Sequence, residues 1–250
     1  MHPASYLKAR TFLDTYAAEV KRPGERIRVL EVGSKSYHEQ DTYRELFVDS
    51  QYTYTGLDIE AGANVDIVPD NRFVWKELPD DSFDLCISGQ TFEHNPYFWV
   101  TFAEMARVLV PGGLALVVAP GGGHVHRYPL DCWRFYPDSW AALCALTGME
   151  LVESYFETDR LAARVVGGGW RDSAVIARKP RHSGEQLDMF QARLKRIVSV
   201  LSEESLPVAP AASSGAWVAA YRREAERMAP PSWRNWLRRK RIPRIFEPDR

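Results

Sequence analysis

The sequence has 250 residues and a formal net charge of -1, with 45% hydrophobic and 26% charged residues. This length and composition suit a soluble protein with one sizeable domain and appendages, and the near-zero charge argues against general nucleic-acid binding. No apolar run approaches the roughly 20 residues that a membrane-spanning helix requires.

The first expected element is a helix over Tyr6–Val20, where apolar residues recur at helical spacing. Next, an apolar run over Ile27–Val32 predicts a buried strand, and Gly33 follows it. A polar, partly helical segment then leads to a second apolar run over Tyr54–Ile59, which carries Asp58. Strand, glycine turn, helix, strand and carboxylate in this order are typical of the nucleotide-binding half of an open α/β sheet.

The later elements alternate between strand and helix. The expected strands are Val65–Val68, Phe83–Ser88 and Leu114–Ala119, followed by two last strands over Met149–Phe156 and Ala174–Ala177. One expected helix covers Phe98–Leu109 and is stopped by Pro111-Gly112-Gly113. A second covers Asp138–Leu146, with Asp138 as its cap. This alternation predicts right-handed crossovers and a mostly parallel sheet of seven strands. Ligands of such sheets bind at the carboxyl ends of the strands.

The first turn holds a single glycine, where a dinucleotide fingerprint has three. Gly33 has no Cβ, so the backbone can turn sharply there and approach a ligand closely. Glu31 stands two residues earlier, and a carboxylate at that position repels a pyrophosphate but suits a positive amino group. Asp58 can accept hydrogen bonds from both hydroxyls of a ribose. This combination fits S-adenosylmethionine better than NAD.

Four segments in this order resemble the class I S-adenosylmethionine-dependent methyltransferases, in their type 11-like form. They are Val29–Ser34, Gly56–Ile59, Leu78–His94 and Glu104–Pro120, and the resemblance covers roughly residues 25 to 180. It implies a Rossmann-like, doubly wound fold and S-adenosyl-L-methionine as the cofactor. The segment His126–Trp140 is similar to a bacterial subgroup linked to glycan and polysaccharide modification, which implies a sugar acceptor.

The resemblance also implies cofactor contacts. The residues concerned are Glu31, Gly33, Ser34, Asp58, Ile59, Asp70, Ser88 and Gly89. Glu31 and Gly33 would lie at the methionine moiety and Asp58 at the ribose. Asp70, or Asn71 beside it, would lie near the adenine amino group, although a carboxylate after a proline is also typical of a turn. Ser88 and Gly89 would flank the sulfonium.

Histidines near two strand ends are the catalytic candidates. His124 and His126 follow three glycines at the end of the fifth expected strand, and His94 follows Glu93 after the fourth. Methyl transfer to an alcohol requires the oxygen to lose its proton, which a neutral imidazole can accept. We favour His126 for this role. The alternatives are a structural loop histidine, or a metal site with Glu93 or Asp131 as the third ligand; our prediction includes no metal.

The candidates for acceptor binding are polar and aromatic side chains around these histidines. They are Glu93, Tyr128, Asp131, Trp133 and Arg134. Sugar rings bind against aromatic faces, while carboxylates and arginines bind their hydroxyls. The structural alternative is that Trp133 packs onto the domain and Arg134 pairs with Asp131 or Asp138.

The composition changes after Pro180, and we expect a methyltransferase domain over residues 1–180 and a helical, basic extension over 181–250. Gln186–Leu201 has the pattern of an amphipathic helix, Ser205–Gly215 that of a linker. Residues 222–250 hold ten Arg or Lys against four Asp or Glu, interleaved with aromatic residues. Such a tail can pack on its own domain or on a second copy in a homodimer, lie on an anionic membrane surface, or bind nucleic acid. Packing is the interpretation we prefer.

The cysteines and the first residues bear on localisation. Cys86, Cys132 and Cys144 show neither metal nor disulfide spacing, and the first residues lack the apolar core of a secretory signal. We therefore expect a cytoplasmic protein with reduced thiols. Its predicted function is O-methylation of a hydroxyl on a sugar or glycan precursor. The alternatives are N- or C-methylation of a small metabolite, and a non-catalytic scaffold with a degenerate cofactor fold.

Overall fold

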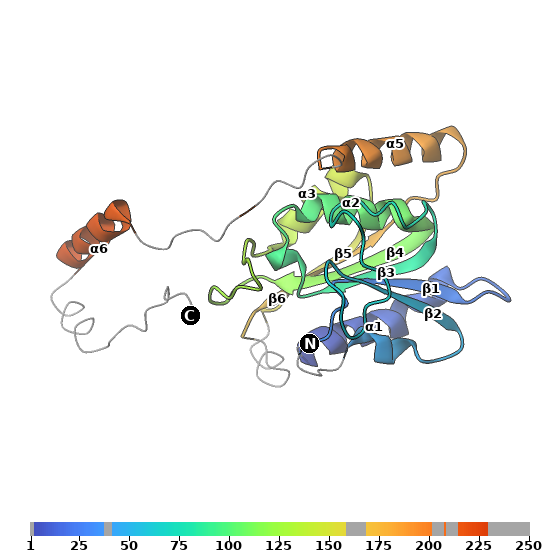
Figure 1. Ribbon diagram of the computed structural model, residues 1–250, viewed down its shortest axis with the longest axis horizontal. Helices are drawn as coiled ribbons and strands as arrows, with labels where there is room; N and C mark the ends of the chain where they lie inside the picture. Colours follow the sequence, from blue (N-terminus) through green and yellow to red (C-terminus); the bar gives the residue numbers. More distant parts are fainter. Residues whose placement is uncertain (1–2, 38–41, 159–168, 202–207, 209–214, 230–250) are drawn as a thin grey trace.

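The computed structural model describes residues 3–37, 42–158, 169–201, 208 and 215–229. Its elements are α1 (Pro3–Val20), β1 (Ile27–Val32), the 3-10 helix η1 (Tyr43–Phe47), β2 (Tyr52–Leu57), β3 (Phe83–Gly89), the 3-10 helix η2 (Phe92–His94), α2 (Phe98–Val108), β4 (Leu109–Pro120), α3 (Pro137–Thr147), β5 (Glu150–Phe156), β6 (Asp172–Arg178), α5 (Glu185–Ser199) and α6 (Ala216–Met228). The strands form one sheet with helices on both faces (Figure 1).

The strand order is β2-β1-β3-β4-β6-β5. The pairs from β2 to β4 are parallel, whereas β6 runs antiparallel to both of its neighbours. The predicted doubly wound, mostly parallel sheet is confirmed, with six strands in place of seven. The chain turns back across β1 after β2, so the switch point of the topology lies between β1 and β3.

The missing strand is the one predicted over Val65–Val68. This segment makes only the isolated bridge between Leu57 and Ile67. The Asp66 carboxylate accepts the Gly56 backbone N–H at 2.7 Å, and Pro69 has no N–H to donate to a ladder. Both effects stop the pairing after one residue.

Two hydrophobic clusters lie on the two faces of the sheet. On one face, α1 and η1 cover β1, β3 and β4. On the other, α2, α3 and α5 form the covering layer (Figure 1). The inner strands are buried almost throughout, as expected for parallel strands covered on both faces. Their continuous apolar runs therefore match their place in the core.

Two predicted boundaries are wrong. Pro111-Gly112-Gly113 does not follow the helix as a stop, because the chain is already a strand from Leu109 onward. There the Gly112 N–H donates to the carbonyl of Lys179 at 2.8 Å. Asp138 is not the cap of α3: Tyr136 occupies that position, Pro137 starts the helix, and Asp138 lies in the first turn, where a negative charge is favourable.

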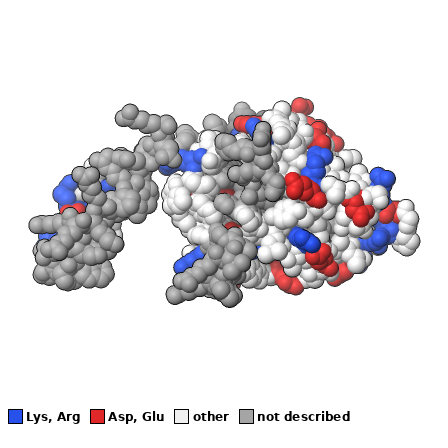
Figure 2. Space-filling view, turned by 90° about the horizontal axis from the view of Figure 1, so that it is seen from below, with Lys and Arg blue, Asp and Glu red and all other residues white. Residues whose placement is uncertain are grey.

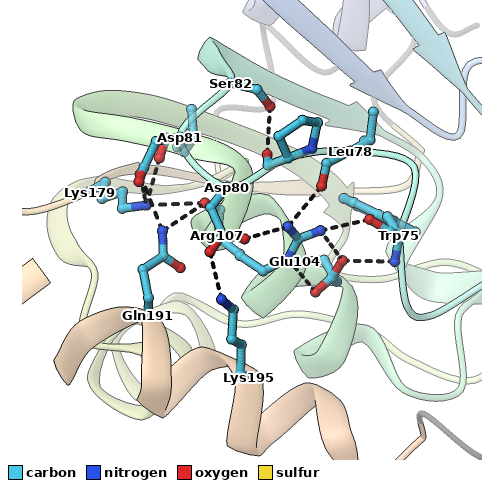
Figure 3. A network of polar contacts seen from close by, with 12 residues as sticks. Trp75, Leu78, Asp80, Asp81, Ser82, Glu104, Arg107, Lys179, Gln191 and Lys195 are labelled. Atoms are coloured by element: carbon cyan, nitrogen blue, oxygen red, sulfur yellow. Dashed lines mark hydrogen bonds and ion pairs between the residues drawn. The ribbon is translucent and has the colours of Figure 1, made fainter. Parts of the chain in front are cut away.

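Helix α5 is attached to the rest of the fold by a buried polar network (Figure 3). The Lys179 side chain is 0% exposed and donates to Asp81 and to the carbonyls of Arg107 and Leu109. Gln191 of α5 donates to the same Asp81 and to the same Arg107 carbonyl. Arg107 in turn bonds Glu104 of its own helix.

The apolar side of α5 belongs to the same core as the sheet. Phe190, Leu194 and Val198 are buried in the cluster beneath α2 and α3. The predicted boundary after residue 180 stays a prediction, and this packing favours a boundary after Leu201. Helix α6 lies apart from the body (Figure 1), and none of its residues is buried. The basic residues 230–250 and nearly all of the expected linker lie outside the described residues.

The described surface mixes charges of both signs. In the view of Figure 2, acidic and basic side chains alternate over the body. Among the described residues, every helix is too short or too polar to cross a lipid bilayer.

Candidate active site

The switch point brings the turn after β1 against the turn after β3. Gly33 has φ +78°, a left-handed conformation that favours glycine, and a Cβ there would overlap the Thr91 side chain. Thr91 follows β3 and donates to the carbonyl of Gly89 at 3.2 Å. The close approach of these two turns therefore depends on the absence of a side chain at Gly33.

Asp58 stands directly after β2 and is 9% exposed. One carboxylate oxygen accepts the Lys35 backbone N–H at 2.9 Å, and the other accepts the Glu60 N–H at 3.2 Å. Burial raises the pKa of this carboxyl, while these backbone hydrogen bonds oppose the rise. A carboxylate has about four lone-pair positions, so two remain for a ligand. Asp58 thus orders the turn after β1 and can still accept hydrogen bonds.

Glu31 lies inside the sheet, 3% exposed, and accepts a hydrogen bond from the Tyr54 hydroxyl of β2. Asn64 donates to the same hydroxyl at 3.1 Å and to the Ser34 carbonyl at 2.7 Å. Burial raises the pKa of the Glu31 carboxyl to about 8. Glu31 therefore supports the turn from below through Tyr54 and Asn64.

The other predicted cofactor residues differ in their surroundings. Ser88 is buried and donates to the Val32 carbonyl at 2.9 Å, which joins the ends of β1 and β3. Gly89 leaves room for the Tyr43 hydroxyl. Ser34 is buried, whereas Ile59 is 49% exposed. Asp70 is exposed and donates its backbone N–H to Glu77 at 2.9 Å, as in a turn.

The ends of β3 and β4 bring together Glu93, His94 and His126, whose ligating atoms all lie within 4.8 Å of one another. The two imidazole rings meet edge to face, with centroids 4.8 Å apart. Leu130 accepts a hydrogen bond from Nδ1 of His94 at 2.6 Å, since a carbonyl can only accept. The ring is thereby fixed with Nε2 toward Glu93, 3.7 Å from Oε1.

Electrostatics in this cluster follow from burial. Glu93 is 0% exposed, and both carboxylate oxygens are buried without a hydrogen-bond partner among the described residues. Burial raises the pKa of the Glu93 carboxyl to about 8 and lowers the pKa values of His94 and His126 below the usual histidine value. At neutral pH both imidazoles are therefore mostly neutral and able to accept a proton or a metal ion.

Asp131 fixes the loop that carries the histidines. It accepts the His126 backbone N–H at 2.7 Å and binds Arg134 through two hydrogen bonds of 2.5 and 2.8 Å. Burial opposes ionisation of Asp131, but Arg134 and the His126 N–H together lower its pKa. Nδ1 of His126 lies 3.5 Å from Asp131, longer than a hydrogen bond. Arg134 also donates to the His124 carbonyl at 2.7 Å.

Tyrosines connect this cluster to the turn after β1. The Tyr128 ring lies 6.0 Å from His94 and 6.3 Å from Tyr37, which follows Gly33 by four residues. Tyr128 and Tyr37 are 62% and 48% exposed. The turn after β1 and the histidine cluster are thus joined by neighbouring aromatic rings.

Sequence reasoning missed three residues of this site: Thr91, Tyr37 and Trp170. Trp170 places its ring 4.7 Å from His124 and 4.4 Å from His126. The glycines at 167–169, directly before Trp170 and the last strand, are the signal that could have found it. Thr91 has no local signal, because its importance comes from Gly33 across the sheet.

Trp133 lies apart from the histidines. Its indole N–H donates to the Asn95 carbonyl at 3.0 Å, and its ring packs on Phe98 and Trp99 at the start of α2. These contacts, and the hydrogen bonds from Arg134 to Asp131, match the structural alternative, in which Trp133 packs onto the domain and Arg134 pairs with Asp131. The roles of all the site residues stay predictions.

Comparison with known proteins bears on the domain and on the fold. Residues 30–117 match the family model described as a methyltransferase domain. An uncharacterised methyltransferase of Mycobacterium ulcerans (strain Agy99) is 48% identical over 52 residues, 19% of this chain and 20% of that protein. The chain therefore spans about a fifth of the length of the curated relatives it matches.

Two solved structures share the fold. The 1,6-didemethyltoxoflavin-N1-methyltransferase of Burkholderia thailandensis, solved with bound 1,6-didemethyltoxoflavin and S-adenosylhomocysteine, has a TM-score of 0.53 at 15% identity, covering 71% of this chain and 79% of that one. An S-adenosylmethionine-dependent methyltransferase of Archaeoglobus fulgidus has a TM-score of 0.50 at 17% identity, covering 70% and 95%. This protein thus has the Rossmann-like fold of these methyltransferases, and its residues 30–117 match the methyltransferase domain model.

Proposed function

We propose that this protein transfers a methyl group from S-adenosyl-L-methionine to an oxygen of a small-molecule acceptor, a hydroxyl of a sugar or glycan precursor. The observation that supports this most is the continuity of the site: a glycine turn and a carboxylate at the switch point lie beside a buried carboxylate with two histidines. The first part suits an adenosyl sulfonium, and the second suits a group that must lose a proton.

The cofactor end is supported by Asp58 and Gly33. Asp58 retains lone pairs that can accept both ribose hydroxyls while it holds the turn through Lys35. Gly33 allows the methionine portion to approach the backbone beside Thr91. A positive amino group bound above the turn would favour ionisation of the Glu31 carboxyl beneath it, because a nearby positive charge lowers the pKa of a carboxyl.

At the acceptor end, His126 is the side chain that we propose as proton acceptor. As the sulfonium carbon–sulfur bond breaks, the carbon–oxygen bond forms, and the hydroxyl proton passes to His126. The products are a methyl ether and S-adenosylhomocysteine. Asp131 holds the loop and therefore the position of the imidazole. Alignment of the acceptor with the sulfonium supplies the rest of the rate enhancement.

A sugar acceptor is supported by the surroundings of His126. Exposed faces of Tyr37 and Tyr128 can stack on an apolar sugar face. Asp131 and Arg134 can exchange part of their mutual pairing for hydroxyl contacts. The resemblance of His126–Trp140 to a glycan-modifying subgroup points in the same direction.

Calorimetric titration with S-adenosylmethionine tests the cofactor end. We expect Asp58→Asn to raise the Kd by about 10- to 100-fold, because hydrogen bonds to a charged group contribute about 1.5–3 kcal/mol. The control is Asp49→Asn, before the opposite end of β2, where the carboxylate accepts the Gln51 N–H at 2.9 Å. An unchanged Kd in Asp58→Asn, or no binding to the wild type, would refute the proposed cofactor.

Transfer of labelled methyl to a panel of sugar and glycolipid acceptors tests the acceptor end. With an acceptor identified, His126→Ala should lower kcat by about 10²- to 10⁴-fold while cofactor affinity is kept. His182→Ala, next to α5, is the control. Unchanged turnover in a His124→Ala, His126→Ala double variant would instead favour methyl transfer to nitrogen or carbon.

A further inference from the structure

We propose that Glu93, His94 and His126 bind one divalent transition-metal ion, with zinc as the best match. Their ligating atoms lie within 4.8 Å of one another, close enough to converge on one ion after small side-chain rotations. Two imidazoles and one carboxylate are a donor set of catalytic zinc sites and of related first-row metals. Magnesium and calcium prefer oxygen ligands throughout, so they fit less well.

The buried carboxylate of Glu93 is the strongest observation for this ion. Its two oxygens are buried and have no hydrogen-bond partner among the described residues. The nearby Arg134 guanidinium pairs with Asp131 at 2.5 Å, so its charge is already largely matched. A buried carboxylate without a partner is costly, and a divalent ion at this position would satisfy it.

His94 is held in the orientation that a metal ligand needs. Its Nδ1 donates to the Leu130 carbonyl at 2.6 Å, which leaves the lone pair of Nε2 free on the side of Glu93. A backbone carbonyl behind the far nitrogen is a common support of metal-binding histidines. Nε2 lies 3.7 Å from Oε1 of Glu93, near the separation of about 3.4 Å between two ligands of a tetrahedral zinc site.

His126 completes the set from the other strand end. Its Nδ1 is buried and has no hydrogen-bond partner within the described part of the chain, and its ring stands edge to face with that of His94 at 80°. The side chains of His94 and His126 are 17% and 22% exposed, whereas Glu93 is fully covered. The three ligands therefore form a base that is open toward solvent, where a fourth ligand can bind.

Binding of the ion does not depend on the proposed function, but its role in the reaction does. An ion here would bind the acceptor oxygen and make its proton more acidic. His126 would then hold the ion and would not act as the free base, and the acceptor's proton would pass to solvent at the open side of the cluster.

The experiment is a titration of the full-length, chelator-treated protein with ZnCl₂ alone, followed by calorimetry and by metal analysis after dialysis. We expect one ion per chain. Glu93→Gln, His94→Ala and His126→Ala should each weaken binding by at least about 100-fold. His124→Ala, on the same loop, and His182→Ala, near α5, should bind as the wild type does. A thermal unfolding curve of each variant excludes misfolding as the cause.

Absence of binding to the wild type would overturn the inference, and so would equal affinity in the three ligand variants, which would indicate adventitious surface binding. Substitution with Co²⁺ adds a spectroscopic check, because its visible absorption should appear in the wild type and vanish in His126→Ala. A parallel titration with S-adenosylmethionine separates the two proposals: zinc without cofactor binding refutes only the function, and cofactor without zinc refutes only the metal site.

Discussion

At the scale of single residues, the turn after β1 depends on what Gly33 lacks. The sequence predicts that the Gly33 backbone approaches a ligand closely. The structure shows in addition that the Thr91 side chain, from the turn after β3, lies close to Gly33. Asp58 and the histidines could be found from the sequence because each follows an apolar strand run. Thr91 could not, because the contact joins residues 58 positions apart (91 minus 33) through the order of the strands.

Alanine substitutions at Gly33 and at Gly24 separate the cost of the left-handed backbone from the cost of overlap with Thr91. Gly24 is the matched control: its φ of +76° is nearly that of Gly33, but nothing lies within 4 Å of a Cβ there. We expect Gly24→Ala to lower the free energy of unfolding by about 1–2 kcal/mol, and Gly33→Ala by about 1–3 kcal/mol more because of overlap with Thr91. Urea denaturation measures both.

Thr91→Ala provides the second half of this test. In the Gly33→Ala background it should restore part of the lost stability, since it removes Oγ1 and Cγ2, the two nearest of the three Thr91 atoms that the new Cβ meets. Equal losses in Gly24→Ala and Gly33→Ala would contradict the close approach of the two turns.

Glu31 gives a prediction about pH. Its folded-state pKa of about 8 lies above the ordinary value of 4.5, so between these pH values the folded protein holds a proton that the unfolded chain has released. The free energy of unfolding should therefore fall as the pH rises from about 4.5 to about 8, by up to about 1.4 kcal/mol per pH unit. Glu31→Gln should lack this decline.

The measurement is the difference between wild type and Glu31→Gln in urea denaturation across that pH range. The difference cancels the titration of all other groups, and the exposed Glu150→Gln on β5 is the control. A difference that stays constant with pH would show that Glu31 is ionised throughout.

At the scale of elements, apolar runs predict where strands lie better than where they pair. The runs for β1, β3 and β4 became buried strands because helices cover them on both faces. The run over Val65–Val68 forms only one bridge, because the Asp66 carboxylate accepts the Gly56 N–H and Pro69 beyond the run has no N–H to donate. The sequence also could not predict that α5 joins the core, because an amphipathic pattern shows that a helix has an apolar side but not which surface that side packs on.

Helix α5 should contribute to the stability of the domain. Leu194 is 0% exposed and part of the core cluster, so Leu194→Ala should lower the free energy of unfolding by about 2–5 kcal/mol. Met189, on the same helix, is 67% exposed, and Met189→Ala should change it by less than about 0.5 kcal/mol. Circular dichroism during urea denaturation measures both variants. A small loss in Leu194→Ala would place α5 outside the cooperative domain.

At the scale of the whole molecule, the described residues form one α/β body and a helix, α6, that stands apart from it. The change of composition after Pro180 predicts an extension, but the body continues through α5. Packing on the body ends after Leu201 in the part of the chain that the structure describes, since α6 buries none of its residues. Composition could not reveal this, because a charged amphipathic helix can pack through its apolar side.

Substitutions at two tryptophans, one in the body and one in α6, test whether α6 is separate from the body. Trp140 is 0% exposed, stacks on Phe135 and donates to Ser173 at 2.7 Å, so Trp140→Ala should lower the stability of the body by about 3–5 kcal/mol. Trp217 of α6 is 75% exposed, and Trp217→Ala should leave the unfolding midpoint of the body unchanged. Differential scanning calorimetry checks both. A lower midpoint in Trp217→Ala would mean that α6 is bound to the body.

The position of α1 has a consequence for biosynthesis. Its side chains Ala9, Phe12 and Leu13 are buried with residues of β3 and β4, which leave the ribosome much later than α1 itself. Until then only β1 and η1 are present to contact this helix, and the face of the sheet that α1 covers stays incomplete. Completion of the fold therefore waits for the middle of the chain, and chaperones that bind apolar segments can meet α1 first.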